Sequence, residues 1–223
     1  MYFAFFPRSF ILFLMQAAAL RELLTPFIPA AELDDPILAA IQVHLDLLLR
    51  WNAHMNLTAL RTPEEIVIRH FGESLFAARQ LFAHDATEVV FDLGSGAGFP
   101  GLPMKYWAPQ LRLTLIEGHG KKATFLREVG RALKLDDLAV LNTRAESLSE
   151  RAALVTMRAV EKFDQALVAA AGLLAPGGRL ALLIGLSQRD RALSLLPNGV
   201  STHVELPSSD QRILLLWKPS SSK

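Results

Sequence analysis

The sequence predicts one α/β domain: a mostly parallel seven-stranded sheet with an N-terminal helical cap and a terminal antiparallel hairpin. Apolar residues recur at helical spacing over residues 20–86, and from Thr87 onward strand and helix patterns alternate. Such alternation is typical of a parallel sheet that is covered by helices on both faces. A hydrophobic fraction of 51% in 223 residues allows a sizeable core and argues against a globally disordered chain.

The helical cap is predicted from two helix-start signals and one apolar face. Asp34 comes two residues before Pro36, and proline is well tolerated in the first turn of a helix. Thr62 directly precedes Pro63 and two glutamates, which suit the positive end of the helix dipole. The apolar residues that share one face are Leu38, Ile41, Leu45, Leu48 and Leu49. We expect residues 20–86 to belong to the same domain as the sheet.

Residues 1–19 form a strongly apolar N-terminal extension. The run from Ser9 to Leu20 is shorter than the roughly 20 residues that a transmembrane helix needs. We expect either a start codon assigned too early, with Met15 as the true first residue, or a non-essential extension. A signal segment, contact with a membrane and a packed helix are the alternatives.

From Thr87 onward predicted strands alternate with predicted helices. The strands are Glu88–Leu93, Leu111–Glu117, Leu138–Asn142, Leu154–Arg158 and Arg179–Ile184, and the helices are Leu102–Trp107, Lys121–Leu133 and Asp164–Leu174. A turn from Ala175 to Gly178 is predicted before the fifth strand. His203–Leu206 and Arg212–Trp217 read as the closing antiparallel pair. Residues 87–218 are therefore the predicted ligand-binding core.

The segment from Val89 to Gly101 is the most informative part of the chain. A buried strand runs into three alternating glycines, Gly94, Gly96 and Gly98, and a helix follows. Glycine is needed where a ligand approaches the backbone closely, because a Cβ would block contact and disfavour positive φ. The amides at the start of the helix can face polar ligand atoms. This arrangement predicts a nucleotide-like ligand on a Rossmann-like core rather than a plain glycine turn.

Two acids distinguish between candidate ligands. The spacing of Gly96, Gly98 and Gly101 also satisfies the dinucleotide pattern, but Asp92 at the strand end would repel a pyrophosphate. The same carboxylate would attract the methionine ammonium of S-adenosylmethionine (SAM). Glu117 ends the next strand about 20 residues later, where an acid accepts hydrogen bonds from ribose hydroxyls. The predicted cofactor is therefore SAM, with Ala145 and Glu146 near its adenine edge.

Composition restricts the other classes of site. The sequence has no cysteine, which excludes a disulfide framework and thiolate chemistry, and its six histidines are scattered without metal-ligand spacing. A net charge of +1 argues against coating nucleic acid by bulk charge. Local recognition through a basic patch remains compatible with it.

Several motifs together resemble one family, the small-subunit ribosomal RNA methyltransferase G family, also called glucose-inhibited division protein B. The resemblance covers Leu45 to about Gly185. Its motifs are Trp51-Asn52 with Asn56-Leu57-Thr58, Arg69-His70 with Ser74, the loop Gly94–Gly101, Gly120-Lys121-Lys122 with Phe125-Leu126, Arg144-Ala145-Glu146, and Arg158-Ala159.

The resemblance implies transfer of a methyl group from SAM to N7 of a guanine in the 530 loop of 16S ribosomal RNA, at position 527 in the family. It implies that Gly94, Phe99, the Ala145-Glu146 pair and Arg158 contact the cofactor or its pocket. Arg158 is also the candidate catalytic residue, and a purely structural ion pair is the alternative. The candidate RNA contacts are Arg61, Arg69, His70, Lys121, Lys122, Arg127 and Arg158.

The implied partner is 16S rRNA, in the small ribosomal subunit or its precursor, and we expect a cytoplasmic monomer without a stable membrane partner. The sequence departs from the family at Ile184, where relatives often carry a lysine before Gly185. Two other hypotheses remain: a SAM methyltransferase for another RNA or a small molecule, and a non-enzymatic module that binds RNA or NAD.

Overall fold

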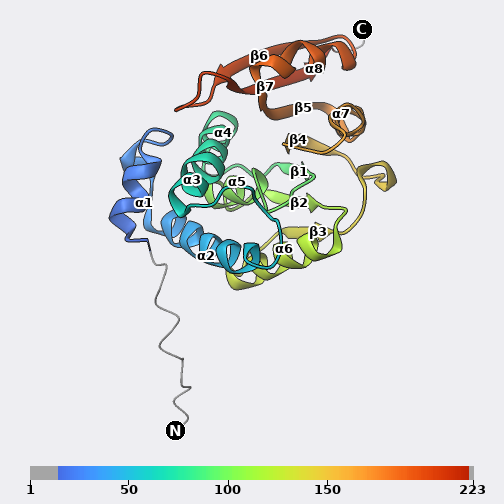
Figure 1. Ribbon diagram of the computed structural model, residues 1–223. Helices are drawn as coiled ribbons and strands as arrows, with labels where there is room; N and C mark the ends of the chain where they lie inside the picture. The colour runs from blue at the N-terminus through green and yellow to red at the C-terminus, as the bar shows by residue number, and fades with distance from the viewer. Residues whose placement is uncertain (1–14, 221–223) are drawn as a thin grey trace.

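The computed structural model describes residues 15–220, and its centre is one seven-stranded sheet with the order β3-β2-β1-β4-β5-β7-β6 (Figure 1). The strands are β1 (Val89–Leu93), β2 (Arg112–Ile116), β3 (Leu138–Leu141), β4 (Ala152–Arg158), β5 (Leu174–Gly185), β6 (Gly199–Glu205) and β7 (Arg212–Pro219). Strands β1 to β5 pair in parallel, and β7 is antiparallel to both β5 and β6. The predicted parallel sheet with a terminal antiparallel hairpin is confirmed.

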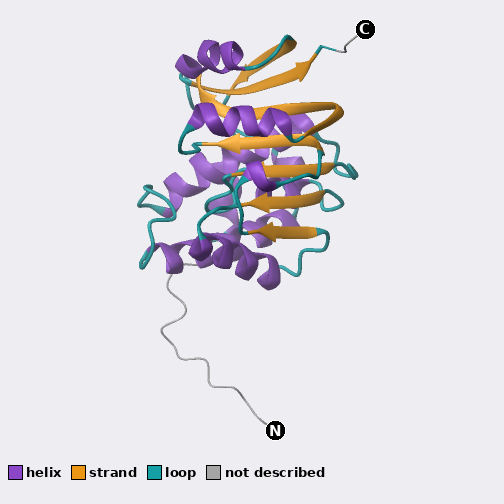
Figure 2. Cartoon of the chain, turned by 90° about the vertical axis from the view of Figure 1, so that its right-hand side faces the viewer, coloured by secondary structure: helices purple, strands orange, loops and turns teal. Residues whose placement is uncertain are grey.

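Helices pack on both faces of this sheet (Figure 2). They are α1 (Ala17–Leu24), η2 (Ala30–Glu32), α2 (Asp35–Asn52), α3 (Pro63–Ile66), η3 (Val67–Gly72), α4 (Glu73–Leu81), α5 (Gly101–Trp107), α6 (Gly120–Ala132), η4 (Ala145–Ser147), α7 (Phe163–Gly172), η5 (Leu186–Gln188) and α8 (Arg189–Leu195). The N-terminal helices, together with α5 and α6, cover one face, whereas α7 and α8 cover the other.

Each buried strand contributes to two separate cores because successive side chains point to opposite faces of the sheet. In β1, Val90 packs among the N-terminal helices, whereas Phe91 packs with Leu167 of α7 and Ala192 of α8. This double burial explains why the strand sequences read as continuous apolar runs. The N-terminal helices thus pack on the same face of the sheet as α5 and α6.

Both predicted helix starts are capped as expected. Asp34 Oδ1 accepts a hydrogen bond of 2.9 Å from the backbone N–H of Ile37 at the start of α2. At the start of α3, Thr62 and Glu65 form a reciprocal capping box. Each interaction satisfies backbone donors that have no partner within the helix.

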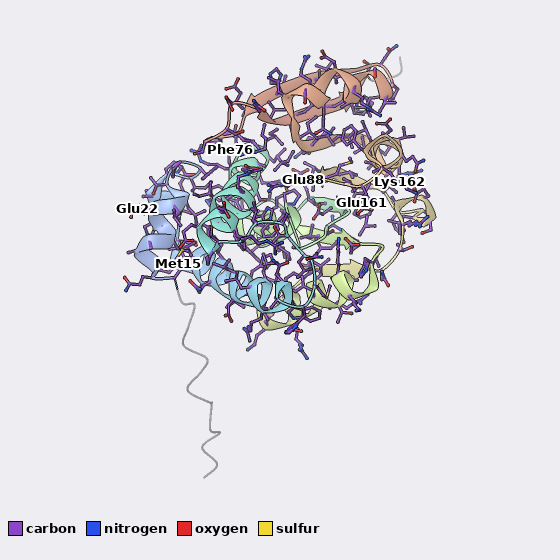
Figure 3. All side chains as sticks on the ribbon, viewed as in Figure 1. Met15, Glu22, Phe76, Glu88, Glu161 and Lys162 are labelled. Carbon is purple, nitrogen blue, oxygen red and sulfur yellow. The ribbon has the colours of Figure 1, made fainter. Side chains whose placement is uncertain are left out.

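The predicted boundary between residues 19 and 20 falls inside α1, where Leu20 and Leu24 are buried. Met15, which Figure 3 labels, packs against the same core. The rest of the predicted apolar extension, residues 1–14, lies outside the described residues. Within residues 15–220, no helix has the length and apolarity that a membrane crossing demands.

One C-terminal prediction needs correction, and one C-terminal helix was missed. The segment from Ala175 to Gly178 belongs to β5, which begins at Leu174 and pairs there with Ala152. Gly177 has a φ of +76°, so the chain makes an irregular step at this point without leaving the sheet. Helix α8 was not predicted at all, because its seven residues are too few to show a clear helical period.

Candidate active site

The loop between β1 and α5 has a backbone conformation that favours glycine. Gly94, Gly96 and Gly98 have φ angles of +70°, +55° and +91°. A Cβ on Gly94 would lie 2.5 Å from a methyl carbon of Val160, and one on Gly98 would lie 2.4 Å from a methyl carbon of Leu102. Because Val160 and Leu102 approach the backbone this closely, only glycine fits at positions 94 and 98 without a shift of these side chains.

A pocket of about 630 Å³ lies against this loop, beside the carboxyl ends of the parallel strands. The strand order reverses at β1, which lies between β2 and β4, and open α/β sheets bind ligands at such a reversal. The cap contributes Leu57 and His70 to the walls. The predicted cofactor-binding residues that line the pocket are Gly94, Gly96, Phe99, Glu117, Ala145, Glu146 and Arg158, whereas Asp92 and Gly98 lie behind its wall.

Glu117, directly after β2, is held in place by three backbone or amide contacts. Its Oε2 accepts a hydrogen bond of 2.8 Å from Gly96 N–H, and its Oε1 accepts one of 2.7 Å from His119 N–H. The side-chain amide of Asn142, after β3, donates to the backbone carbonyl of Glu117 at 2.9 Å. This carboxylate is therefore oriented in advance at the pocket wall, where hydroxyl donors of a ligand can reach it.

Asp92 lies beneath the glycine loop and is fully buried. Its Oδ2 accepts a hydrogen bond of 3.1 Å from Gly101 N–H at the start of α5, and its Oδ1 is buried without a hydrogen-bond partner. Burial raises the pKa of this carboxyl to about 7. Asp92 therefore supports the loop through Oδ2, and its Oδ1 stays free to accept a hydrogen bond.

A stack of three rings forms the wall between the loop and the cap. The ring of Phe99 lies between those of His44 and His70, with ring centroids 5.0 Å and 4.7 Å away and interplanar angles of 9° and 24°. Burial lowers the pKa of His44 to about 4 and that of His70 to about 3, and the nearby Arg158 and Arg69 lower the latter further. Both imidazoles are therefore neutral at physiological pH.

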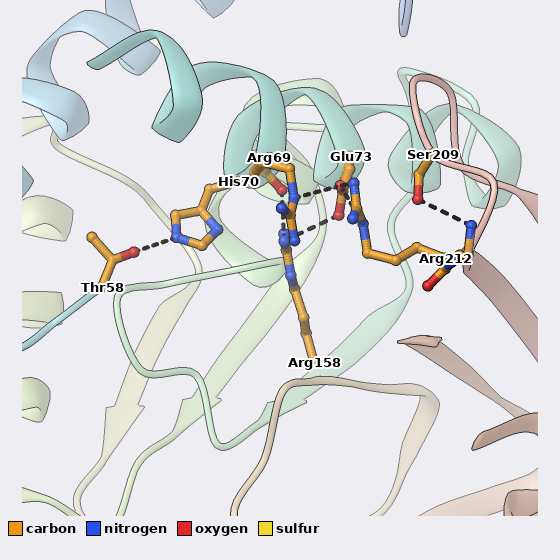
Figure 4. A network of polar contacts seen from close by, with 8 residues as sticks. Thr58, Arg69, His70, Glu73, Arg158, Ser209 and Arg212 are labelled. Atoms are coloured by element: carbon orange, nitrogen blue, oxygen red, sulfur yellow. Dashed lines mark hydrogen bonds and ion pairs between the residues drawn. The ribbon is translucent and has the colours of Figure 1, made fainter. Parts of the chain in front are cut away.

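His70 is positioned by a loop of the cap. Thr58 Oγ1 lies 2.7 Å from His70 Nε2, a contact that Figure 4 shows, whereas His70 Nδ1 is buried without a hydrogen-bond partner. Asn52 Oδ1 in turn accepts from the backbone N–H groups of Leu57 and Thr58, at 2.9 and 3.0 Å. The end of α2 thus fixes this loop, and the loop fixes the histidine at the pocket wall.

Arg158, at the end of β4, is buried and ion-paired. Its Nη2 lies 3.0 Å from Glu73 Oε2 and donates to the carbonyl of Arg69 at 2.6 Å. Burial lowers the pKa of Arg158 to about 10, and Glu73 opposes this effect. The guanidinium is thus charged and joins the pocket wall to helix α4.

Most of the remaining predicted RNA contacts do not line the pocket. Lys122 on α6 lines the pocket, whereas Lys121 on the same helix is exposed outside it. Arg127 donates to the carbonyl of Val140 at 3.2 Å, and Arg61 is exposed just before α3. No cluster of three or more His, Asp or Glu side chains suited to a metal ion occurs in the part of the chain that the structure describes.

Comparison with known proteins agrees with this geometry. Residues 37–204 match the model of the GidB family, rRNA small subunit methyltransferase G. The chain belongs to this methyltransferase G family. Over 172 residues it is 41% identical to the ribosomal RNA small subunit methyltransferase G of Xanthomonas axonopodis pv. citri, an alignment that covers 76% of this chain and 79% of the relative. The protein of that name from Xylella fastidiosa is 38% identical over 171 residues, with the same coverage.

Solved structures with low sequence identity share the fold of this methyltransferase G family member. A ribosomal protein L11 methylase from Lactobacillus delbrueckii matches with a TM-score of 0.55 and 10% identity, over 69% of this chain and 80% of the other. A precorrin-6y C5,15-methyltransferase from Geobacter metallireducens matches with a TM-score of 0.51 and 14% identity, over 73% and 92%.

Part of the residues that carry the methyltransferase G resemblance line one pocket, but sequence reasoning missed several neighbours. His44 and Glu73 were not predicted, because a lone histidine or glutamate on a helix carries no local signal. Glu161 and Lys162, just before α7, also line the pocket (Figure 3). Ile184, in place of the family lysine, is buried and pairs with Ile213 of β7.

Proposed function

We propose that this protein transfers the methyl group of SAM to N7 of a guanine in the 530 loop of 16S rRNA. The observation that carries the proposal is the family match over residues 37–204, because these residues contain the whole pocket and most of the sheet. The relatives named ribosomal RNA small subunit methyltransferase G align over 79% of their own length.

The backbone and the acids of the pocket support SAM as its ligand. Glu117 presents a fixed carboxylate to ribose hydroxyls, and the glycine loop leaves its backbone open to a ligand. The buried Oδ1 of Asp92 has no hydrogen-bond partner, which supports Asp92 as the acid that attracts the methionine ammonium. Ala145 and Glu146 in η4 line the pocket, which supports their assignment to the adenine edge. When bound, SAM supplies an electrophilic methyl group on a sulfonium.

Methylation at N7 demands positioning rather than proton transfer. Guanine N7 has a free lone pair and loses no proton on attack, so no general base is required. The neutral His70, whose ring stacks on Phe99, offers a flat surface for the base. Arg158 lies at the same wall, where its fixed cation orients the bound ligands.

RNA binding is assigned to basic side chains near the pocket and to the neutral His70. Lys122 and His70 lie at its wall, whereas Arg61, Arg69, Lys121 and Arg127 lie farther out and suit phosphate contacts. The substrate is the small ribosomal subunit or its precursor, so we place the reaction in the cytoplasm, with the enzyme as a monomer and without a stable membrane partner.

The proposal is tested with tritiated SAM and small ribosomal subunits from cells that lack this gene. Free 16S rRNA and precursor particles serve as parallel substrates. Label in 7-methylguanosine at the 530 loop, identified by mass spectrometry of the digested RNA, is the expected result. Comparison of the three substrates shows which stage of assembly is methylated.

Absence of transfer to all three substrates, with SAM binding intact by calorimetry, would contradict the assigned substrate and direct the search to another RNA or a small molecule. Absence of SAM binding would contradict the cofactor as well. The Glu117→Gln variant is the matched control for the cofactor site, because it removes one charge at the pocket wall and keeps the side-chain size.

A further inference from the structure

Three arginines converge on one buried glutamate beside the pocket (Figure 4). Glu73, at the start of α4, has only 1% of its side chain exposed. Its Oε1 lies 3.3 Å from Arg69 Nε and 2.7 Å from Arg212 Nη2, and its Oε2 lies 3.0 Å from Arg158 Nη2. The three cations come from the cap, from the end of β4 and from the start of β7.

The charges in this cluster do not balance. One carboxylate faces three guanidinium groups, which leaves an excess of two positive charges. Asp92 is the other acid that acts on Arg158, but its pKa of about 7 leaves it only partly ionised. Arg69 and Arg212 are partly exposed, so the excess positive charge faces the rim of the pocket, where it attracts an anion.

Donor groups in the cluster are left without acceptors. Arg158 lines the pocket with 10% of its side chain exposed. Its Nη1 is buried and has no hydrogen-bond partner. Arg69 contacts Glu73 through Nε, and its side chain is 41% exposed. Arg212 contacts the same oxygen through Nε and Nη2 and is 27% exposed. The cluster is therefore open to an anion from the outer rim.

We propose that Arg69, Arg158 and Arg212 form an oxyanion site that binds a backbone phosphate of the RNA substrate beside the target guanine. Glu73 is the positioning residue that holds the three guanidinium groups together. The inference rests on the proposed function, since it assigns a role within RNA binding.

The location favours a phosphate over the carboxylate of SAM. Arg158 lines the pocket, whereas Arg69 and Arg212 lie outside its walls and are partly exposed. A cofactor inside the pocket reaches only the first of the three. A phosphodiester at the rim, next to a base inserted into the pocket, reaches all three and meets the planar donor geometry that arginine offers to phosphate.

The test compares Arg212→Gln with a matched control, Arg179→Gln. Arg179 is 28% exposed and forms a two-point ion pair with Glu88, much as Arg212 does with Glu73. It lies in β5 six residues before Gly185, the residue that pairs with Arg212. Thermal unfolding is first measured in inorganic phosphate and in chloride at equal ionic strength. Phosphate is expected to raise the midpoint of the wild type and of Arg179→Gln more than that of Arg212→Gln.

The second measurement is kcat/KM for methyl transfer to small subunits as a function of KCl concentration, with SAM affinity measured in parallel. Arg212→Gln is expected to lower kcat/KM about tenfold. It should also reduce the slope of log(kcat/KM) against log[KCl] by about 0.7 to 0.9, the value for one lost phosphate contact. SAM affinity should not change.

An equal phosphate response in all three proteins would overturn the oxyanion site. A lost phosphate response with weaker SAM binding and an unchanged salt slope would assign the anion to the carboxylate of SAM and overturn the RNA contact. If the wild type transfers no methyl group to small subunits but shows the phosphate response that Arg212→Gln lacks, the oxyanion site stands and the proposed function fails.

Discussion

His44 on α2 donates a hydrogen bond of 2.9 Å from its Nε2 to the carbonyl oxygen of Ala97 in the glycine loop. Because the carbonyl can only accept, Nε2 carries the proton, and Nδ1 accepts from the hydroxyl of Tyr106 at 3.0 Å. Burial keeps the imidazole neutral by lowering its pKa to about 4. A helix of the cap thus fixes the conformation of the loop that borders the pocket.

Replacing His44 by phenylalanine should loosen this loop while it keeps a ring beside Phe99. The carbonyl of Ala97 and the hydroxyl of Tyr106 would both lose buried partners, at about 1–3 kcal/mol each. We expect unfolding in urea at lower concentration and SAM binding that is about tenfold weaker by calorimetry. Tyr106→Phe removes only the second bond and is the control. Equal SAM affinity in the wild type and His44→Phe would contradict a role of this contact in shaping the loop.

The neutral histidines make the stability of the fold depend on pH. The pKa of His44 is about 4 in the folded protein against an ordinary 6.5, so the unfolded chain binds more protons between these values. The free energy of unfolding should therefore fall as pH decreases from about 6.5 to about 4, by on the order of 3 kcal/mol from this group. His70, with a pKa of about 3, acts in the same direction. Urea unfolding of the wild type and His44→Phe at pH 4.5 and 7 measures the difference, which should be smaller in the variant.

Asp92 should make SAM binding depend on pH near neutrality. Burial raises its pKa to about 7, so the free protein is largely protonated at this site below pH 7. Pairing with the ammonium of SAM favours the carboxylate, and binding must then release a proton. SAM affinity should rise between pH 6 and pH 8, and Asp92→Asn should be weaker and show a flatter profile. A profile that the substitution leaves unchanged would assign Asp92 to loop support alone.

The parts of the fold that repeat a local pattern were predictable from sequence. Strand β1, the glycines and Glu117 lie within one short stretch, and each follows from backbone geometry or from the period of the strands. Capping at Asp34 and Thr62 is equally local. These features need no knowledge of which distant segments meet.

The contacts that cross the chain were not predictable. Glu73 meets Arg158 and Arg212 over 85 and 139 residues, and His44 meets Ala97 over 53. No spacing rule links such pairs, since they are brought together by the packing of the cap on the sheet. For Asp92 the sequence predicted the position at the end of the strand. Its burial beneath the loop was not predictable, because it depends on how Gly101 packs against it.

Gly101 should not accept a side chain. A Cβ there would lie 2.7 Å from Asp92 Oδ2 and 2.8 Å from a methyl carbon of Leu115, both in the core. Gly101→Ala should lower the free energy of unfolding by about 1–3 kcal/mol. Gly172, at the end of α7, has nothing within 4 Å of the same position, so Gly172→Ala should be neutral or stabilise by up to about 1 kcal/mol. Urea unfolding of both variants decides this; equal effects would contradict the tight approach at Gly101.

The carboxylate of Glu117 should determine SAM affinity without affecting the methyl-transfer step. Its two oxygens accept from Gly96 and His119, so an amide in Glu117→Gln would place N–H against N–H on one side and lose an ionic acceptor for the ribose. A loss of about 1.5–3 kcal/mol corresponds to a ten- to hundredfold rise in the Kd of SAM. Because the ribose contact is the same before and during transfer, kcat at saturating SAM should change little. Glu88→Gln, at the far end of β1, should leave both constants unchanged. If Glu117→Gln lowered kcat and left the KM for SAM unchanged, Glu117 would act on the reacting atoms and not on the ribose.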